Sequence, residues 1–144
     1  MTPEAVSKLV SLLASRLRVV IPAQFFVQVT EEGLLFTSDY SYAAPASARW
    51  LYRPLALSEG IAWRFEGNEN VREYDLESVV NSAWFALSRI QDFISEATTD
   101  PWPGSASQPG LPYAEVRDDA LHFGYGDPAS PVLACEPIPL TELL

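Results

Sequence analysis

The stretch "DLESVVNSAWFALSRIQDFISEAT", residues 75–98, decides the fold class of this chain. Its apolar residues recur every three or four positions, as Leu76, Val80, Ala83, Leu87, Ile90, Ile94 and Ala97. At 1.5 Å per residue, this spacing makes one face of a helix apolar over about 36 Å. Asp75 is placed to cap the helix, and Tyr74 and Val79 are placed to pack against each other across that cap. The stretch predicts a long helix that packs on a core by one face.

Phe85 departs from the pattern of this helix. At about 100° per residue, it points away from the apolar face, toward the side that carries Asn81, Asp92 and Glu96. Two explanations stay open, because single exposed aromatic residues are common. Either another segment covers this polar side, or Phe85 is an exposed anchor for a partner.

The segment that follows the helix, residues 99–112, is rich in proline and contains Trp102 between two prolines. Prolines favour an extended chain of about 3.1 Å per residue, so the segment is long enough to run back along the helix. We predict a strap that covers Phe85 and places Trp102 near Arg89 or Asp92. The alternatives are a mobile loop and a Trp102 that is kept free as a partner anchor.

The N-terminal part of the chain predicts a helix and a hairpin. Thr2 and Pro3 are typical of a helix start. Apolar residues follow at helical spacing, as Val6, Leu9, Val10, Leu13, Leu17 and Val20. Apolar residues then alternate over residues 25–29 and again over 34–36, which predicts two strands joined by a turn in which Gly33 adopts a left-handed conformation.

Residues 39–57 fit two structures, a helix that opens at Pro45 or a strand that ends near Pro54. We favour a strand over residues 50–57. A hairpin would then join it to "IAWRFEG", residues 61–67.

The C-terminal part of the chain predicts further strands. Residues 113–126 form two short strands around a turn at Asp118 and Asp119, and residues 131–140 form a final strand that its prolines cut short. The order of elements predicts an α+β fold. In this fold, one antiparallel sheet of about five to seven strands carries the N-terminal helix and the long central helix on one face.

The length and composition of the chain limit the number of domains and indicate the cellular location of the protein. With 144 residues, 48% of them hydrophobic, we expect a single globular domain over residues 1–144, with the strap inside it. No apolar run approaches the roughly 20 residues of a membrane span, and the start "MTPEAVSKLV" has an acid where a signal peptide has basic residues. We therefore expect a cytoplasmic protein without membrane contact.

The basic residues indicate the kind of genome that encodes the chain. Eight of the nine basic residues are Arg, which is typical of a GC-rich genome, and we expect a bacterial genome.

Several chemistries are disfavoured by the residue counts. The net charge of −10 opposes nucleic-acid binding, which depends on Lys and Arg neutralising phosphates. The chain has one histidine, His122, and one cysteine, Cys135, so it lacks the ligand pairs of common zinc sites, and it has no glycine-rich phosphate loop. We expect no nucleic-acid partner, no metal and no other cofactor.

A thiol beside an imidazole is a nucleophile in many enzymes. If Tyr125 faces Val132 in the last hairpin, His122 lies opposite Cys135, whereas a shift of one residue puts the two side chains on opposite faces. A free cysteine is more often a small core residue. We assign no catalytic residue to this chain.

Arg49, Arg53 and Arg64 lie in the sequence among the aromatic residues Trp50, Tyr52, Trp63 and Phe65. Guanidinium groups beside aromatic faces can hold a carboxylate, a phosphate or a planar ring. An anion site at residues 49–65 is one explanation. Ordinary ion pairs on a strand surface are the other.

The chain is best explained as a non-enzymatic, acidic protein-binding module, such as an adaptor, a chaperone or an immunity-type inhibitor. We expect its partner to be a protein with a basic surface, because complementary charge steers association. The expected partner-binding residues are aromatic, namely Phe85, Trp102, Trp50 and Tyr52. The alternative is a small-anion or small-molecule binding protein or enzyme that uses the cluster at residues 49–65. The sequence leaves open whether copies of the chain form a homo-oligomer.

Overall fold

The structure is a computed structural model that describes residues 3–30, 33–38, 50–52, 76–105, 107–108 and 110–143. In these residues the chain has an α+β fold with two antiparallel sheets. The helices are α1 (Pro3–Val20), α3 (Leu76–Thr98) and α4 (Leu140–Leu143). The N-terminal sheet contains β1 (Phe25–Thr30), β2 (Gly33–Ser38) and β3 (Trp50–Tyr52). The C-terminal sheet contains β4 (Pro112–Arg117), β5 (Ala120–Asp127), β6 (Ser130–Ala134) and β7 (Ile138–Pro139).

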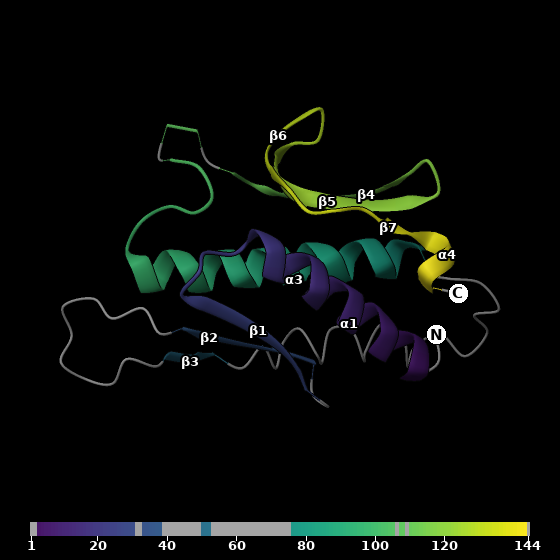
Figure 1. The fold of residues 1–144 in the computed structure, drawn as a ribbon. Helices are drawn as coiled ribbons and strands as arrows, with labels where there is room; N and C mark the ends of the chain where they lie inside the picture. The colour runs from purple at the N-terminus through teal and green to yellow at the C-terminus, as the bar shows by residue number, and fades with distance from the viewer. Residues whose placement is uncertain are drawn as a thin grey trace.

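The two long helices lie in a layer between the two sheets, with the C-terminal sheet above α3 and the N-terminal sheet below it (Figure 1). The N-terminal helix and the long central helix are thus confirmed, and so is the α+β class. The prediction of one sheet with both helices on one face is wrong for the described strands. The physical reason is that the buried arc of α3 is wider than the predicted stripe. It includes Phe93 and Ala86 as well as Leu87 and Ile94, so the helix is apolar toward both sheets.

The N-terminal hairpin follows the predicted alternation. Thr30 pairs with Gly33 across the turn, and Gly33 has a φ of 127°, a conformation that favours glycine. Phe25 and Val27 of β1 are buried, whereas Phe26 between them is exposed. The predicted strand at residues 50–57 is described only over β3, which pairs with β2. The rest of that strand and its predicted hairpin partner lie outside the described residues.

The C-terminal sheet contains the predicted strands around Asp118 and Asp119, whose φ angles of 53° and 57° are those of a tight hairpin turn. The predicted final strand divides into two pieces, because the chain between β6 and β7 contains Pro137 and leaves the ladder. The second piece, β7, pairs with the start of β5.

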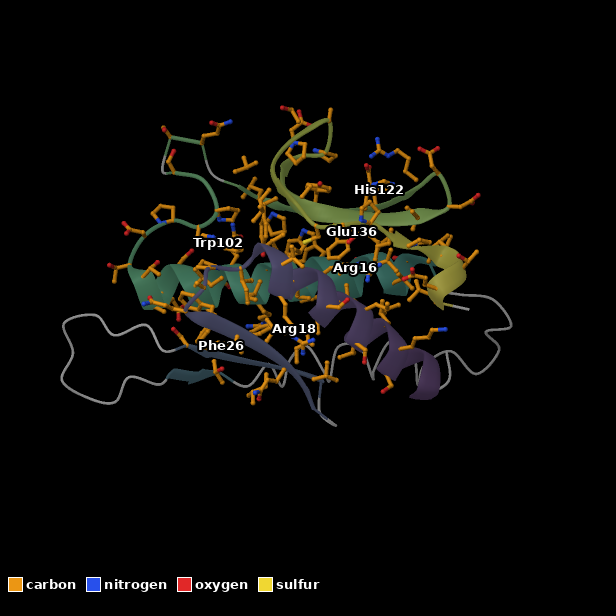
Figure 2. All side chains as sticks on the ribbon, in the orientation of Figure 1. Arg16, Arg18, Phe26, Trp102, His122 and Glu136 are labelled. Carbon is orange, nitrogen blue, oxygen red and sulfur yellow. The ribbon has the colours of Figure 1, made fainter. Side chains whose placement is uncertain are left out.

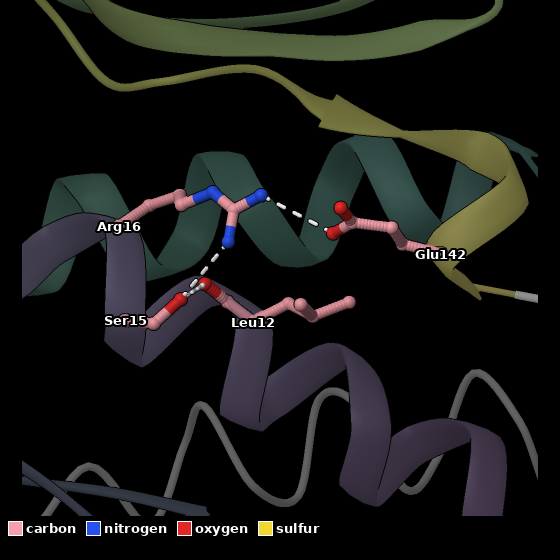
Figure 3. A network of polar contacts seen from close by, with 4 residues as sticks. All are labelled: Leu12, Ser15, Arg16 and Glu142. Atoms are coloured by element: carbon pink, nitrogen blue, oxygen red, sulfur yellow. Dashed lines mark hydrogen bonds and ion pairs between the residues drawn. The ribbon is translucent and has the colours of Figure 1, made fainter.

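A short C-terminal helix, α4, was not predicted, and it ties the end of the described chain to α1. Leu143 of α4 is buried in the core. Nη2 of Arg16 on α1 lies 3.2 Å from Oε2 of Glu142, and Nη1 of Arg16 donates a hydrogen bond to Oγ of Ser15 (Figure 3). The contact joins the C-terminal sheet to the helix layer, since α4 follows β7 directly.

Two further predictions concern the N-terminal cap of the central helix and the absence of a membrane-spanning helix. The predicted cap at Asp75 and its flanking contact lie outside the described residues. In the described part of the chain, no helix combines the length and the apolar character that a membrane span requires.

Candidate partner-binding surface on the central helix

Described elements pack on α3 from three directions. The C-terminal sheet is held to it by a hydrogen bond of 2.7 Å from Oη of Tyr125 to the carbonyl oxygen of Leu87. The N-terminal sheet packs Phe25 and Phe36 against Phe93, with ring centroids 5.7 and 6.2 Å away. Helix α1 lies alongside α3 in the same layer (Figure 1). The remaining side of α3 is the one on which a large aromatic side chain is exposed.

Residues four positions apart form a ridge on a helix, and because each step turns about 40° around the axis, one such row crosses this remaining side as it winds along α3. We name it the α3 ridge, and its members are Leu76, Val80, Trp84, Ser88, Asp92 and Glu96. Leu76 and Trp84 are 42% and 41% exposed, Asp92 and Glu96 are exposed, and the other two are half-buried. The ridge is therefore apolar over its first half and polar to acidic over its second half.

Trp84 of the ridge forms an aromatic pair with Phe85 of the neighbouring row, with ring centroids 5.6 Å apart and an edge-to-face angle of 87°. Phe85 is half-buried and packs against the core, although the sequence placed it opposite the apolar stripe. Because the buried arc of α3 is wide, Phe85 lies at its margin rather than in solvent. Trp84 is the more exposed of the two rings.

Leu76 also differs from its prediction. The sequence placed it at the start of the buried stripe, but it is exposed at the first position of the described helix. Helical spacing fixes the direction of a side chain, whereas burial depends on how far the neighbouring elements extend along the axis. This difference converts a predicted core residue into the first member of the ridge.

Segment 99–112 contacts α3, as far as the structure describes it. The backbone N–H of Trp102 donates to Oγ of Ser95 at 3.3 Å, and Nε2 of Gln91 donates to the carbonyl oxygen of Gly110. The predicted position of the Trp102 ring near Arg89 or Asp92 stays a prediction. The ring packs edge-to-face on Tyr125 of β5, with centroids 5.1 Å apart.

Trp102 therefore joins the segment to the C-terminal sheet, and it is half-buried there (Figure 2). Leu111, which follows the contact between Gln91 and Gly110, is 67% exposed. Its carbonyl oxygen accepts a hydrogen bond of 2.8 Å from the backbone N–H of Gly126. The C-terminal end of the segment is thus fastened to β5 through its backbone.

His122 and Cys135 lie on opposite faces of the C-terminal sheet. Tyr125 pairs with Leu133, one residue away from the register that would have brought the two together. Cys135 is buried, and burial raises the pKa of its thiol from 9.0 to about 12. His122 lies near the carbonyl oxygen of Arg117, at 3.1 Å from Nε2. His122 and Cys135 therefore do not form the nucleophile pair that a pairing of Tyr125 with Val132 would have allowed.

The cluster at residues 49–65 is largely outside the described residues. Arg49, Arg53 and Arg64 are not described, and β3 is described by its backbone alone. The register pairs Trp50 with Ser38 and Tyr52 with Phe36. The anion-site hypothesis and the partner role of these two aromatic residues stay predictions.

Within the described ranges, no three or more His, Cys, Asp or Glu side chains lie together in a way that could hold a metal ion. The sequence reasoning missed Trp84 as a surface residue. A signal was available, since at about 100° per residue Trp84 points roughly 60° to 80° away from Leu76, Leu87 and Ile94 of the apolar stripe.

Comparisons with known proteins add no relative: no family model matches the chain, and no curated protein or solved structure matches it either.

Proposed function

We propose that this chain is a non-enzymatic protein-binding module whose partner docks on α3 around Trp84. The observation that supports this best is Trp84, a large aromatic side chain that is 41% exposed on a helix whose other sides are packed. Tryptophan is enriched among the residues that dominate binding energy at protein interfaces, because its ring buries a large apolar area with few rotatable bonds. Trp84, with Phe85 beside it, is the proposed anchor.

The partner is proposed to carry a basic surface. Asp92 and Glu96 are exposed on the ridge, and Glu77 is exposed in the neighbouring row. The chain as a whole has a net charge of −10. A basic partner would be steered toward such a surface, and the gain would shrink as salt shortens the screening length to about 8 Å near physiological ionic strength.

Trp102 was also expected to bind the partner, but the structure supports it less well than Trp84 as an anchor. Its ring packs on Tyr125 and its backbone contacts Ser95, so it already has a role within the fold. A partner that used the Trp102 ring would have to displace it from β5. Trp84 needs no such rearrangement.

Affinity capture from extracts of the native host tests the proposal, with the wild-type chain and two variants as bait. Trp84→Ala should abolish capture of the specific partner, since removing a central anchor of an interface typically weakens binding by tenfold or more, that is by at least about 1.4 kcal/mol. Phe26→Ala is the matched control, because Phe26 on the N-terminal sheet is 43% exposed, as Trp84 is (Figure 2).

Thermal melting of both variants must show that they stay folded. Capture that survives Trp84→Ala but is lost in Phe26→Ala would move the binding surface to the N-terminal sheet. Capture that both variants retain would remove the support for docking around Trp84.

A further inference from the structure

We infer that the outer edge of β6 is a second docking site, at which a short extended segment of another protein adds a strand to the C-terminal sheet. The inference goes beyond the proposed function, because it concerns a different element and does not depend on Trp84. It follows from the backbone groups that β6 directs away from β5 and from the side chains beside them.

β6 is an edge strand of the C-terminal sheet in the part of the chain that the structure describes. It pairs with β5 on one side, and no described strand pairs with its other side. Among the described elements, its extensive contacts are with β5 alone, whereas the opposite edge strand, β4, also packs on α3. Val132 is 39% exposed, and Ala134 is exposed as well. This edge is therefore open to another chain.

The register assigns the backbone groups at this edge. Just after β6, the backbone N–H of Cys135 donates a hydrogen bond of 3.0 Å to the carbonyl oxygen of Phe123 on β5. In an antiparallel pair, alternate residues direct their groups to opposite sides, so Leu133 and Cys135 face β5. The carbonyl oxygen of Val132 and both the N–H and the carbonyl oxygen of Ala134 therefore point away from β5, where they can bond an added strand.

The start of β6 carries two features that protect sheet edges from pairing. Pro131 has no N–H to donate, and an irregularity interrupts the register between Tyr125 and Gly126. Neither feature reaches Ala134, and residues 132–135 contain no charged side chain. The open part of the edge is therefore short, and a segment of a few residues fits it better than a long strand does.

The outer strand of the other sheet, β1, is less open. Nε of Arg18 donates to the carbonyl oxygen of Val27, and the backbone N–H of Phe25 donates to the carbonyl oxygen of Pro22 at 3.0 Å. An added strand at β1 would have to displace these contacts. The edge of β6 at Ala134 requires no such displacement.

The side chains beside the edge specify the chemistry of the segment. A residue opposite Ala134 shares its face of the sheet, and the two residues that flank it lie on the other face beside Leu133, which is half-buried. Those two residues should therefore be apolar. Glu136 is exposed, and its backbone is extended because Pro137 follows it. A Lys or Arg in the segment would pair with this carboxylate.

A second copy of this chain fits the edge less well. Antiparallel pairing of two β6 edges around Ala134 would set Glu136 of one copy opposite Val132 of the other, so the carboxylate would gain no counter-charge. Each copy also carries a net charge of −10. A segment of another protein with basic residues is complementary in charge, and it is the occupant that these observations favour.

The peptide Lys-Val-Thr-Val-Thr-Val-Lys with blocked ends tests the inference on the intact chain. In antiparallel pairing, its Thr residues bond β6 while its Val residues face the side of Leu133. One derivative is N-methylated on both Thr residues, and the matched control is N-methylated on two Val residues. Fluorescence anisotropy of the labelled peptides should show at least about tenfold weaker binding for the first derivative and little change for the control, because only the first loses hydrogen bonds to the edge.

Hydrogen exchange measured by NMR locates the bound peptide. In the free chain, the amide of Ala134 should exchange faster than that of Cys135, which is bonded to Phe123. Saturating peptide should slow the exchange at Ala134 about tenfold, as a new hydrogen bond of about 1.4 kcal/mol would give.

Variants of the chain link binding to this edge. Ala134→Pro removes the outward N–H, which a solvent-facing edge tolerates, and it should abolish binding of the peptide. Ala134→Ser keeps the N–H and is the matched control, with unchanged binding. Trp84→Ala should also leave peptide binding unchanged, and thermal melting checks that every variant is folded.

Equal binding of the two methylated peptides, no measurable binding of the unmodified peptide, or unslowed exchange at Ala134 would overturn the inference. If Ala134→Pro does not fold, the measurements on the wild-type chain decide. Protection of Ala134 in a dimer without peptide, seen by sedimentation velocity, would instead assign the edge to a second copy. Loss of peptide binding in Trp84→Ala would move the peptide to α3, whereas loss of partner capture alone would contradict only the proposed function.

Discussion

The two sheets are attached to the same helix in different ways. The C-terminal sheet and its preceding segment make three hydrogen bonds spaced along α3, at Leu87, Gln91 and Ser95. The N-terminal sheet places Phe25 and Phe36 around the ring of Phe93. The first contact is directional and tolerates little sliding, because a hydrogen bond weakens steeply with distance and angle. The second depends on the apolar area that the rings bury.

These two kinds of contact explain how one helix, α3, can pack against two sheets. Apolar burial supplies most of the energy of both contacts, since it is the main favourable contribution to folding. Hydrogen bonds then fix the position of the C-terminal sheet along the helix, and the packing of the Phe25, Phe36 and Phe93 rings contributes to that of the N-terminal sheet. Five changes would break or sharpen this contrast.

Phe93→Ala should have the largest effect, about 3 to 5 kcal/mol in the free energy of unfolding, because it removes a buried ring that contacts both Phe25 and Phe36. Urea denaturation measures the loss. Hydrogen exchange should show faster opening of β1 and β2 than of β5. Equal opening of both sheets would mean that they unfold as one unit.

Gly124→Ala should destabilise the C-terminal sheet by about 1 to 3 kcal/mol. A Cβ atom at this position would meet the carbonyl oxygen of Leu133 and lie 3.0 Å from the hydroxyl of Tyr113, so β6 would have to move. Ala134→Ser, at the exposed residue that pairs with Gly124, is the control and should change stability by less than about 0.5 kcal/mol. A stability of Gly124→Ala equal to that of the wild type would show that β6 adjusts freely.

Alkaline pH should loosen the C-terminal sheet first. Burial raises the pKa of Tyr125 and, less strongly, of Tyr113, with Cys135 contributing to both, and it raises the pKa of Cys135 to about 12. A raised pKa means that the folded chain keeps a proton that the unfolded chain releases, so stability falls as pH rises above about 9.

For the thiol alone, the expected loss is about 1 kcal/mol between pH 9 and pH 10. Denaturation at a series of pH values measures it, and Cys135→Ala should flatten the curve over this range. An unchanged slope in that variant would assign the dependence to the tyrosines.

Tyr125→Phe should cost about 1 kcal/mol, the usual net contribution of one hydrogen bond, because it removes the bond to the Leu87 carbonyl and keeps the ring against Trp102. Tyr113→Phe, on a half-buried ring of the same sheet, is the matched comparison and should cost less. If the two variants were equally stable, the hydrogen bond would not be what fixes the sheet along α3.

Arg18→Ala should have the smallest effect on stability, below about 1 kcal/mol, because the side chain is exposed. Nε of Arg18 donates a hydrogen bond of 2.8 Å to the carbonyl oxygen of Val27 on β1, the outer strand of the described N-terminal sheet. Positive charge at a sheet edge opposes pairing with another chain. Sedimentation velocity should therefore show more self-association in Arg18→Ala than in Arg117→Ala, and equal behaviour would mean that Arg18 does not protect this edge.

The sequence predicted the local elements well because their signals are local. The spacing of Leu87, Ile90 and Ile94 predicted α3, and the Asp118 and Asp119 pair predicted the turn between β4 and β5. It failed for Trp84 and Leu76, whose exposure depends on where neighbouring elements end. It did not give the contact of the Trp102 ring with Tyr125, because the position of Tyr125 above α3 depends on how the sheet packs.

The sequence by itself determined that this chain forms two amphipathic helices and antiparallel hairpins, since periods of 3.6 and 2 residues and the turn residues depend only on neighbouring positions. It also determined the acidic charge and the single thiol and imidazole. Only the tertiary structure decided that the strands form two sheets on opposite sides of α3. It also separated His122 from Cys135 and left Trp84 exposed on the remaining side. Strand register and the choice of packing partner depend on contacts between residues far apart in the chain, and no local pattern contains them.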